Sequence, residues 1–172
     1  MKNILLVTCF IVTNIFANNY LFGASIGVKP VDNPLYLKEC GSCHFAFQAG
    51  LLPSRSWTKM MKNLENHFGS DASLELEDQK YIEEYLTRYS ADKSMEYKRS
   101  RKIMNLIKNN ETPLRITKTL YFMKKHDQIP TKMIQQKEVL SLSNCMACHT
   151  TASKGIYSER AIKIPNYGKW DD

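Results

Sequence analysis

The sequence lacks any stretch in which apolar and polar residues alternate for the length of a strand, which argues against a β-rich fold. It also lacks the composition of a disordered or fibrous chain, because 43% of its 172 residues are apolar and 24% are charged. Apolar residues recur instead at steps of three and four, as in residues 81–89 and 103–107. We therefore predict one all-α domain over residues 30–172, with short helices joined by long loops.

Long apolar runs are scarce, and one lies near the N-terminus. Residues 2–17 begin with Lys2, continue with mostly apolar side chains and end at Ala17, which is typical of a secretory signal peptide. The run is short for an uncleaved anchor, which needs roughly 20 apolar residues. We expect cleavage of residues 1–17 near Ala17, with Ala24 as a second candidate site, and hence a periplasmic protein. Cys9 would leave with the signal, and the chain would associate with a membrane only through a partner or an uncleaved signal.

Acidic residues are fewer than basic ones: 17 Asp and Glu stand against 24 Lys and Arg, so the formal net charge is +7. A basic chain can bind nucleic acid, but export argues against that partner. We interpret the charge as an aid to solubility and as a means of steering the protein toward an acidic redox partner.

Cysteine is used sparingly and in a repeated pattern. Four of the five cysteines lie in Cys40–His44 and Cys145–His149, both of which read Cys-x-x-Cys-His. This is the attachment motif of c-type haem. On a helix, positions i, i+3 and i+4 share one face, so two thiols can reach the haem vinyl groups while the histidine points at the iron. We therefore predict two covalently bound haem c groups, attached through Cys40, Cys43, Cys145 and Cys148.

Other uses of these cysteines leave part of the pattern unexplained. Disulfides would suit an exported protein but ignore the adjoining histidines. A thioredoxin-like redox pair would occur once, in a strand-to-helix context that this sequence lacks. A structural zinc site is complete with four ligands and would leave both histidines without a role.

The number of histidines matches the number of axial positions on the two predicted haems. Two haems have four axial positions, and the chain has four histidines. His44 and His149 belong to the motifs, which leaves His67 and His126 as the predicted distal ligands of the two irons. A structural role on an apolar face is the alternative for each of these two.

Helical phase supports His67 as an inward-facing side chain. We predict a helix over residues 56–68, capped at its start by Ser54 or Ser56. His67 comes three residues after Leu64 and therefore shares its apolar face.

Helical phase also supports His126. In residues 119–126 it follows Phe122 and Met123 by four and three residues, so it shares their face. Methionine is the rival axial ligand, and those near the two candidate histidines are Met60, Met61 and Met123.

The spacing of the histidines predicts how they pair. His44 precedes His67 by 23 residues, and His126 precedes His149 by 23 residues. We therefore predict that each motif histidine shares an iron with its neighbour in sequence. Crossed pairing is the alternative, because contacts in a fold need not be local in sequence.

Basic side chains offer candidate partners for the haem carboxylates. Arg55 and Arg115 are predicted to contact propionates, because a guanidinium matches a carboxylate in two-point geometry. Solvated arginine is the alternative for both. The run Lys98–Lys102 is typical of a solvated helix face, with partner docking as the second interpretation.

The chain resembles the bacterial dihaem cytochrome c family over most of its mature length. The residues that carry the resemblance are Leu35–Tyr36, Glu39–His44, Gly50–Trp57, His67–Gly69, Leu114–Thr117, Phe122 with His126, and Cys145–His149 through Gly155 to Ile164–Pro165. The sequence departs from the pattern at Phe47–Ala49, where a tyrosine and prolines are expected, and at Leu120–Tyr121, where Pro-Trp is expected.

The resemblance implies two low-spin haems with two histidines each, and electron transfer as the function. It also implies a small oxygen-binding monohaem cytochrome c and a membrane b-type cytochrome as partners. Iron held by two histidines has no open position for a substrate, so we predict an electron carrier with no catalytic residues and comparatively low potentials. The alternatives are a peroxide or nitrite reductase whose distal histidine dissociates, and a gas sensor.

Overall fold

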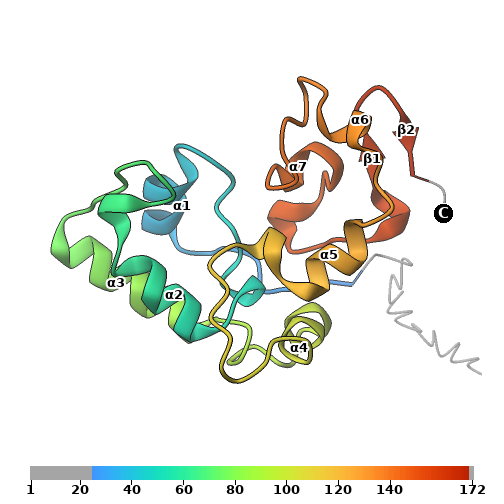
Figure 1. Cartoon of the computed structure of the whole chain (residues 1–172). Coiled ribbons are helices and arrows are strands. Elements are labelled where there is room, and N and C mark those ends of the chain that lie inside the picture. Colours follow the sequence, from blue (N-terminus) through green and yellow to red (C-terminus); the bar gives the residue numbers. More distant parts are fainter. Residues whose placement is uncertain (1–24, 171–172) are drawn as a thin grey trace, which may run out of the picture.

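The computed structural model describes residues 25–170, and its regular structure is mostly helical (Figure 1), which confirms the predicted fold class. The α-helices of this part of the chain are α1 (Pro34–Gly41), α2 (Ser54–Met61), α3 (Leu76–Arg88), α4 (Lys98–Met104), α5 (Leu120–His126), α6 (Thr131–Ile134) and α7 (Cys145–Cys148). Its 3-10 turns are η1 (Ala49–Leu51), η2 (Leu64–Asn66), η3 (Ile116–Lys118), η4 (Ala152–Lys154) and η5 (Glu159–Ala161). A small antiparallel hairpin of β1 (Lys163–Ile164) and β2 (Gly168–Lys169) adds strands that the sequence pattern did not predict.

The signal peptide predicted over residues 1–17, its two candidate cleavage sites and Cys9 all lie outside the described residues, so these stay predictions. Within residues 25–170, every helix is too short or too polar to span a bilayer.

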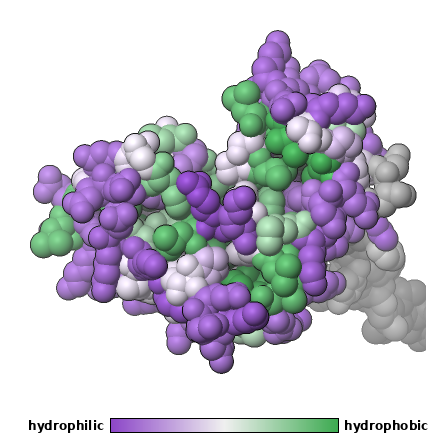
Figure 2. Space-filling view, in the orientation of Figure 1, coloured by the Kyte–Doolittle hydropathy of each residue, from purple (hydrophilic) through white to green (hydrophobic). Residues whose placement is uncertain are grey.

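The helices form two halves, one built from α1 to α3 and the other from α5 to α7 with the hairpin (Figure 1). Helix α4 contacts η1 and α5 and so lies between the halves. Figure 2 shows a notch between them, with apolar residues exposed on the wall that belongs to the second half. Buried Gln48 links the halves, since it donates to the Ala152 carbonyl and accepts a hydrogen bond from the Tyr157 hydroxyl at 2.6 Å.

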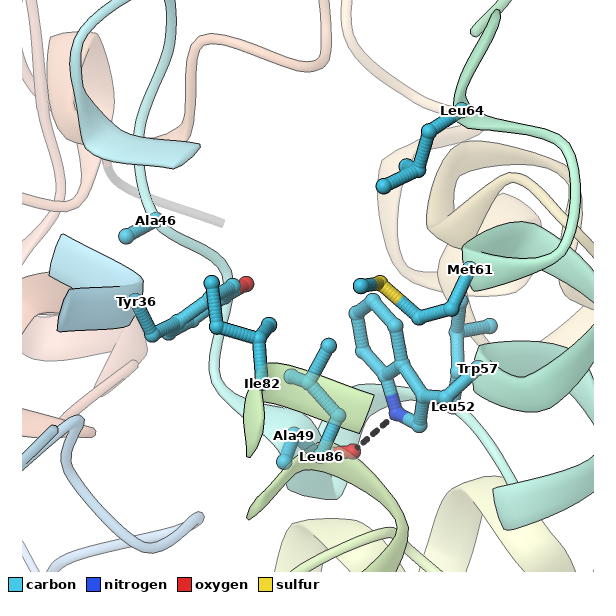
Figure 3. Packing of buried hydrophobic residues seen from close by; sticks show 9 residues of the cluster. All are labelled: Tyr36, Ala46, Ala49, Leu52, Trp57, Met61, Leu64, Ile82 and Leu86. Atoms are coloured by element: carbon cyan, nitrogen blue, oxygen red, sulfur yellow. Dashed lines mark hydrogen bonds between the residues drawn. The ribbon is translucent and has the colours of Figure 1, made fainter. Parts of the chain in front are cut away.

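The first half has an apolar core of its own. Trp57 and Met61 of α2 pack against Ile82 and Leu86 of α3, and none of these side chains is more than 3% exposed (Figure 3). The Trp57 indole N–H donates to the Ala49 carbonyl at 2.8 Å, which satisfies its buried polar atom. The second half lacks a comparably large cluster among the described residues, because its helices are only four to seven residues long.

Helix α2 begins in a different way from the one predicted. Pro53 occupies the N-cap position, and neither Ser54 nor Ser56 caps the helix with its side chain. Asp92 lies there instead: its carboxylate accepts from the backbone N–H of Ser54 at 2.7 Å and from the Ser54 hydroxyl at 2.8 Å. A negative charge at this end of a helix also interacts favourably with the helix dipole.

Helix α2 ends at Met61, so the helix predicted over residues 56–68 is too long. The Asn63 side chain donates to the Asn66 carbonyl, and the Asn66 side chain accepts from the N–H of Gly69, each at 3.3 Å. Asparagine side chains that bond to nearby backbone compete with helical hydrogen bonds. His67 therefore follows η2 in a turn and not in a helix.

The N-terminal segment is fastened to the second half. The N–H of Gly27 donates to the Gly155 carbonyl at 2.8 Å. Gly155 has a φ of +69°, and a Cβ atom at this position would lie 2.1 Å from the Val28 carbonyl oxygen. The close approach and the left-handed backbone both require glycine.

Candidate haem sites

The first Cys-x-x-Cys-His motif lies across the end of α1. The helix begins after Asn33, whose side chain caps it, and it carries Cys40 in its last turn. It ends at Gly41, so Cys43 and His44 lie in the turn that follows. The prediction of one helical face is therefore wrong for this motif, where a turn and not a helix carries the second thiol and the histidine.

The second motif follows the prediction more closely. Helix α7 contains both Cys145 and Cys148, and its C-cap is His149. The N–H of His149 donates to the Cys145 carbonyl at 2.8 Å, which continues the helical hydrogen-bond pattern as far as the histidine.

His67 reaches the first motif from a tight turn. Its N–H donates to the Ser70 carbonyl at 2.8 Å, and the N–H of Ser70 donates back to the His67 carbonyl at 3.2 Å. Phe68 and Gly69 between them have positive φ angles of 56° and 97°. Burial, with help from His44 and Arg115, lowers the pKa of His67. The lower pKa favours the neutral imidazole, which is the form that binds metal.

His126 reaches the second motif from the end of α5. Its Nδ1 atom lies 2.8 Å from the Phe122 carbonyl oxygen, and its ring stacks on the Phe122 ring at 3.8 Å between centroids. Thr119 caps this helix with its hydroxyl, which accepts from the N–H of Phe122. The predicted shared face is right for Phe122 and wrong for Met123, which is 45% exposed.

The structure brings the histidine rings together in the predicted pairs. The centroids of His44 and His67 are 6.1 Å apart, and so are those of His126 and His149. A metal bond to an imidazole nitrogen is about 2 Å long, so two rings on opposite sides of one metal have centres roughly 6 Å apart. Both pairs therefore have the spacing of imidazoles on one iron. The ring planes differ: the angle is 18° in the first pair and 73° in the second.

Hydrogen bonds leave one nitrogen available in a histidine of each pair. A carbonyl oxygen can only accept, so the Nδ1 atoms of His44 and His126 donate to the carbonyls of Phe45 and Phe122, each at 2.8 Å. The proton on Nδ1 leaves Nε2 with a free lone pair. Histidines that bind metal commonly donate their other N–H in this way.

A cavity of about 390 Å³ lies between α5 and α7. Its walls include all four residues predicted for the second haem, which are His126, Cys145, Cys148 and His149, together with apolar side chains such as Phe122 and Ile164. The Nδ1 atom of His149 is buried there and has no hydrogen-bond partner among the described residues. Burial lowers the pKa of His149 to about 4, with smaller contributions from His126 and Arg99. An apolar slot with two thiols and neutral imidazoles fits a covalently bound haem.

The cysteines themselves fit thioether attachment. None of the four in residues 25–170 forms a disulfide. Burial raises the pKa of both Cys40 and Cys145 to about 11, so neither is an activated thiolate of the kind that redox enzymes use. In the described part of the chain, no three His, Cys, Asp or Glu side chains converge as ligands of a bare metal ion. This arrangement gives the zinc alternative no support.

The two arginines predicted to contact propionates lie in different settings. Arg55 donates to the carbonyls of Lys108 and Glu111 at 2.9 and 2.6 Å. Arg115 lies over the ring of Phe68, with its guanidinium carbon 3.9 Å from the ring centre, and is close enough to His67 to help lower its pKa. Both propionate contacts stay predictions, and the Arg115 contact has the more suitable location.

Sequence reasoning missed Arg99 as a site residue, because its neighbours make it look like part of a solvated basic run. Its side chain lines the cavity of the second motif. Tyr121 and Gln48, which stand where the sequence departs from the family pattern, lie in the same region: the Tyr121 hydroxyl accepts from Arg99 at 2.8 Å, and Gln48 bonds to Tyr157.

Comparisons with known proteins give one consistent result. The family described as dihaem cytochrome c matches residues 36–157. A solved diheme cytochrome c from Rhodobacter sphaeroides is 42% identical, with a TM-score of 0.67, over 76% of this chain and 100% of the other. The X-ray structure of a diheme cytochrome c from Shewanella baltica OS155 is 40% identical, with a TM-score of 0.67, over 81% of this chain and 98% of the other. No curated protein sequence gives a significant match.

Proposed function

Because the chain belongs to the dihaem cytochrome c family, we propose that it is a periplasmic electron carrier in which each of the two haem c irons is held by two histidines. Haem c supplies one-electron redox chemistry when bound. The chain supplies the attachment through four cysteines, the axial imidazoles, and an environment that sets the potential of each iron.

The observation that carries the proposal is the repeated histidine pair. Two rings at 6.1 Å in each half would fill both axial positions of an iron between them and would leave no position for a substrate. An iron with both axial positions filled gains or loses an electron with little rearrangement, which suits a carrier better than an enzyme.

Two of the four proposed axial histidines are held by hydrogen bonds to the backbone and not to charged side chains. His44 and His126 donate to carbonyls of their own segments, so each ring is fixed in orientation and tautomer. The low pKa values of His126 and His149, caused mainly by burial, keep these rings neutral and able to coordinate at neutral pH.

The excess of basic residues supports an acidic redox partner. The partners we propose are a small monohaem cytochrome c as the soluble acceptor and a membrane b-type cytochrome as the donor. Neither requires the chain to enter the membrane itself.

Electron paramagnetic resonance of the oxidised protein tests the ligation. We expect low-spin iron at both sites, with two different signals because the ring planes lie at 18° and 73°; the second site should give the more anisotropic signal. The reduced protein should not bind carbon monoxide, since no axial position is open.

Variants of the distal histidines sharpen the test. His67→Ala and His126→Ala should each convert one haem to a high-spin, carbon monoxide-binding form and leave the other unchanged. The matched controls are Glu65→Ala in the first half and Gln135→Ala in the second, which change exposed side chains. Carbon monoxide binding to the unmodified protein would contradict the proposal and favour a haem enzyme or a gas sensor.

A further inference from the structure

Arg99 differs from the other charged residues of its helix. Lys98, Arg101 and Lys102 are exposed, whereas the Arg99 side chain turns inward and lines the cavity of the second motif. Its backbone N–H donates to the Gly27 carbonyl at 2.9 Å. A Cβ atom on Gly27 would lie 3.2 Å from Arg99 Nε, so the glycine leaves room for the guanidinium to pass.

The guanidinium is positioned by two tyrosines. One terminal N–H donates to the Tyr121 hydroxyl at 2.8 Å, and the other donates to the Tyr157 carbonyl at 2.7 Å. The guanidinium carbon also lies 5.0 Å from the centre of the Tyr157 ring, and that ring is 5.4 Å from the ring of His149. The cation is thus held beside the histidine of the second motif.

The positive charge of Arg99 forms no ion pair with a carboxylate among residues 25–170. Its Nε atom is buried and has no hydrogen-bond partner in that part of the chain. Glu159 lines the same cavity and its carboxylate is attracted by Arg99 at longer range, but this carboxylate pairs with Lys125 at 2.6 Å. The one nearby carboxylate pairs with Lys125, so the charge of the half-buried guanidinium is only partly compensated and the site can accept an anion from outside the chain.

The family supplies a molecule with that anion. A haem attached through Cys145 and Cys148 would occupy the cavity that Arg99 lines and would bring two propionate carboxylates with it. Each terminal nitrogen of the guanidinium carries a second N–H besides the one donated to Tyr121 or to the Tyr157 carbonyl, and such N–H groups are a good match for a carboxylate.

We propose that Arg99 binds a propionate of the second haem and raises the reduction potential of that haem. The inference rests on the haem c attached to Cys145 and Cys148, and not on which histidines bind its iron. Reduction transfers one electron from the reductant to ferric iron, giving ferrous iron, so the haem becomes less positive by one charge. A fixed cation beside the haem favours the reduced form.

A purely structural role is the competing explanation. Arg99 connects three segments, those of Gly27, Tyr121 and Tyr157, and its loss could loosen the second half without any specific effect on the haem. The two roles are distinguished by the quantity that changes when Arg99 is replaced. A structural role changes the melting temperature, whereas a charge beside one haem changes the potential of that haem and not of the other.

The test is a redox titration of the two-haem protein followed by electron paramagnetic resonance, which separates the two haems by their ring-plane angles. We compare Arg99→Gln, which removes the charge, with Arg99→Lys, which keeps it. Lys102→Gln is the matched control, because it removes one exposed charge from the same helix. The thermal melt of each variant is measured in parallel.

Arg99→Gln should lower the equilibrium constant for reduction of the second haem about tenfold, or about 59 mV for a one-electron couple, and change the first haem less than about twofold. Arg99→Lys should keep the equilibrium constant of the second haem close to its value in the unmodified protein. Lys102→Gln should change the constant of neither haem by more than about twofold.

Equal shifts of both haems, or a lower melting temperature with unchanged potentials, would overturn the proposal. Should Arg99→Gln fail to fold, Arg99→Met replaces it, because it also removes the charge: a lower potential confined to the second haem supports the proposal, and unchanged potentials refute it. High-spin iron in the unmodified protein would refute the histidine ligation but leave this comparison measurable.

Discussion

The two haem sites have the same ring spacing and different surroundings. The first pair joins an exposed His44 to a His67 held in a turn, with ring planes 18° apart, beside a core that the first half builds for itself. The second pair lies in a cavity, with ring planes 73° apart and the Arg99 cation in the wall. Equal sequence spacing therefore does not produce equal environments, because His67 comes from a turn in one half and His126 from a helix in the other.

The difference in surroundings gives the sites different properties. Ferric haem carries one more positive charge than ferrous haem, and burial disfavours the more charged state. The buried second site should therefore have the higher potential, and the exposed first motif should be the easier one for a partner to approach. The contrast also concerns stability, since the first half has a core without its haem and the second half has a cavity.

The largest effect expected from this contrast follows loss of haem attachment. Cys145→Ala with Cys148→Ala should unfold the second half, whereas Cys40→Ala with Cys43→Ala should leave the first half largely helical around Trp57 and Ile82. The reason is that short helices facing a cavity lose the apolar surface on which they pack, at roughly 25 cal/mol per Å². Circular dichroism and limited trypsin digestion measure the loss in each half. Removing all four cysteines should leave a poorly folded chain, and a native-like melt of that variant would refute the role of haem in folding.

A smaller effect is expected from two glycines with positive φ, one in each half. Gly155→Ala should destabilise the protein by more than about 3 kcal/mol, because its Cβ would lie 2.1 Å from the Val28 carbonyl oxygen. Gly69→Ala should cost roughly 1 to 2 kcal/mol, since it has a φ of +97° but no atom within 4 Å of the new Cβ. Urea unfolding followed by haem absorbance gives both values. Equal losses would show that the N-terminal segment is not fastened through Gly155.

How far the sequence predicts these sites depends on whether the information is local. The two motifs, the helices around Tyr85 and Phe122, and the histidine pairs 23 residues apart are local patterns, and the structure contains all of them. The start of α2 was missed because its capping carboxylate, Asp92, comes from 38 residues further along the chain. Its end was missed because asparagine side chains bond to the backbone there and outweigh an apolar period of three and four.

Arg99 illustrates the same limit at the site itself. A run of five residues with four positive charges predicts a solvated face, and three of the four basic side chains are exposed as expected. What turns the fourth inward is contact with Gly27, Tyr121 and Tyr157, which lie 22 or more residues away in sequence. Arg55 and Arg115 were selected from the sequence because they are arginines. The residue type alone does not specify which cavity a side chain reaches.

The smallest of the predicted effects is a dependence of stability on pH that belongs to the second half. The pKa of His149 falls from its ordinary 6.5 to about 4 because the ring is buried. In the folded protein, burial and the proposed bond to iron both keep His149 unprotonated, whereas the unfolded chain takes up a proton there below pH 6.5. Stability is therefore lost as the pH falls from about 6.5 toward 4, and it is unchanged by this group above that window. At pH 5 the loss of folding free energy should be about 2 kcal/mol.

The two tryptophans can report on the two halves separately, because Trp170 lines the second cavity and Trp57 lies in the first core. Trp57→Phe leaves Trp170 as the fluorescent reporter, and Trp170→Phe leaves Trp57. Urea unfolding at pH 5 and pH 7 should show the loss with the Trp170 reporter and less of it with the Trp57 reporter. An equal loss in both would mean that the two halves unfold as one unit, and the contrast between them would then be one of geometry and not of stability.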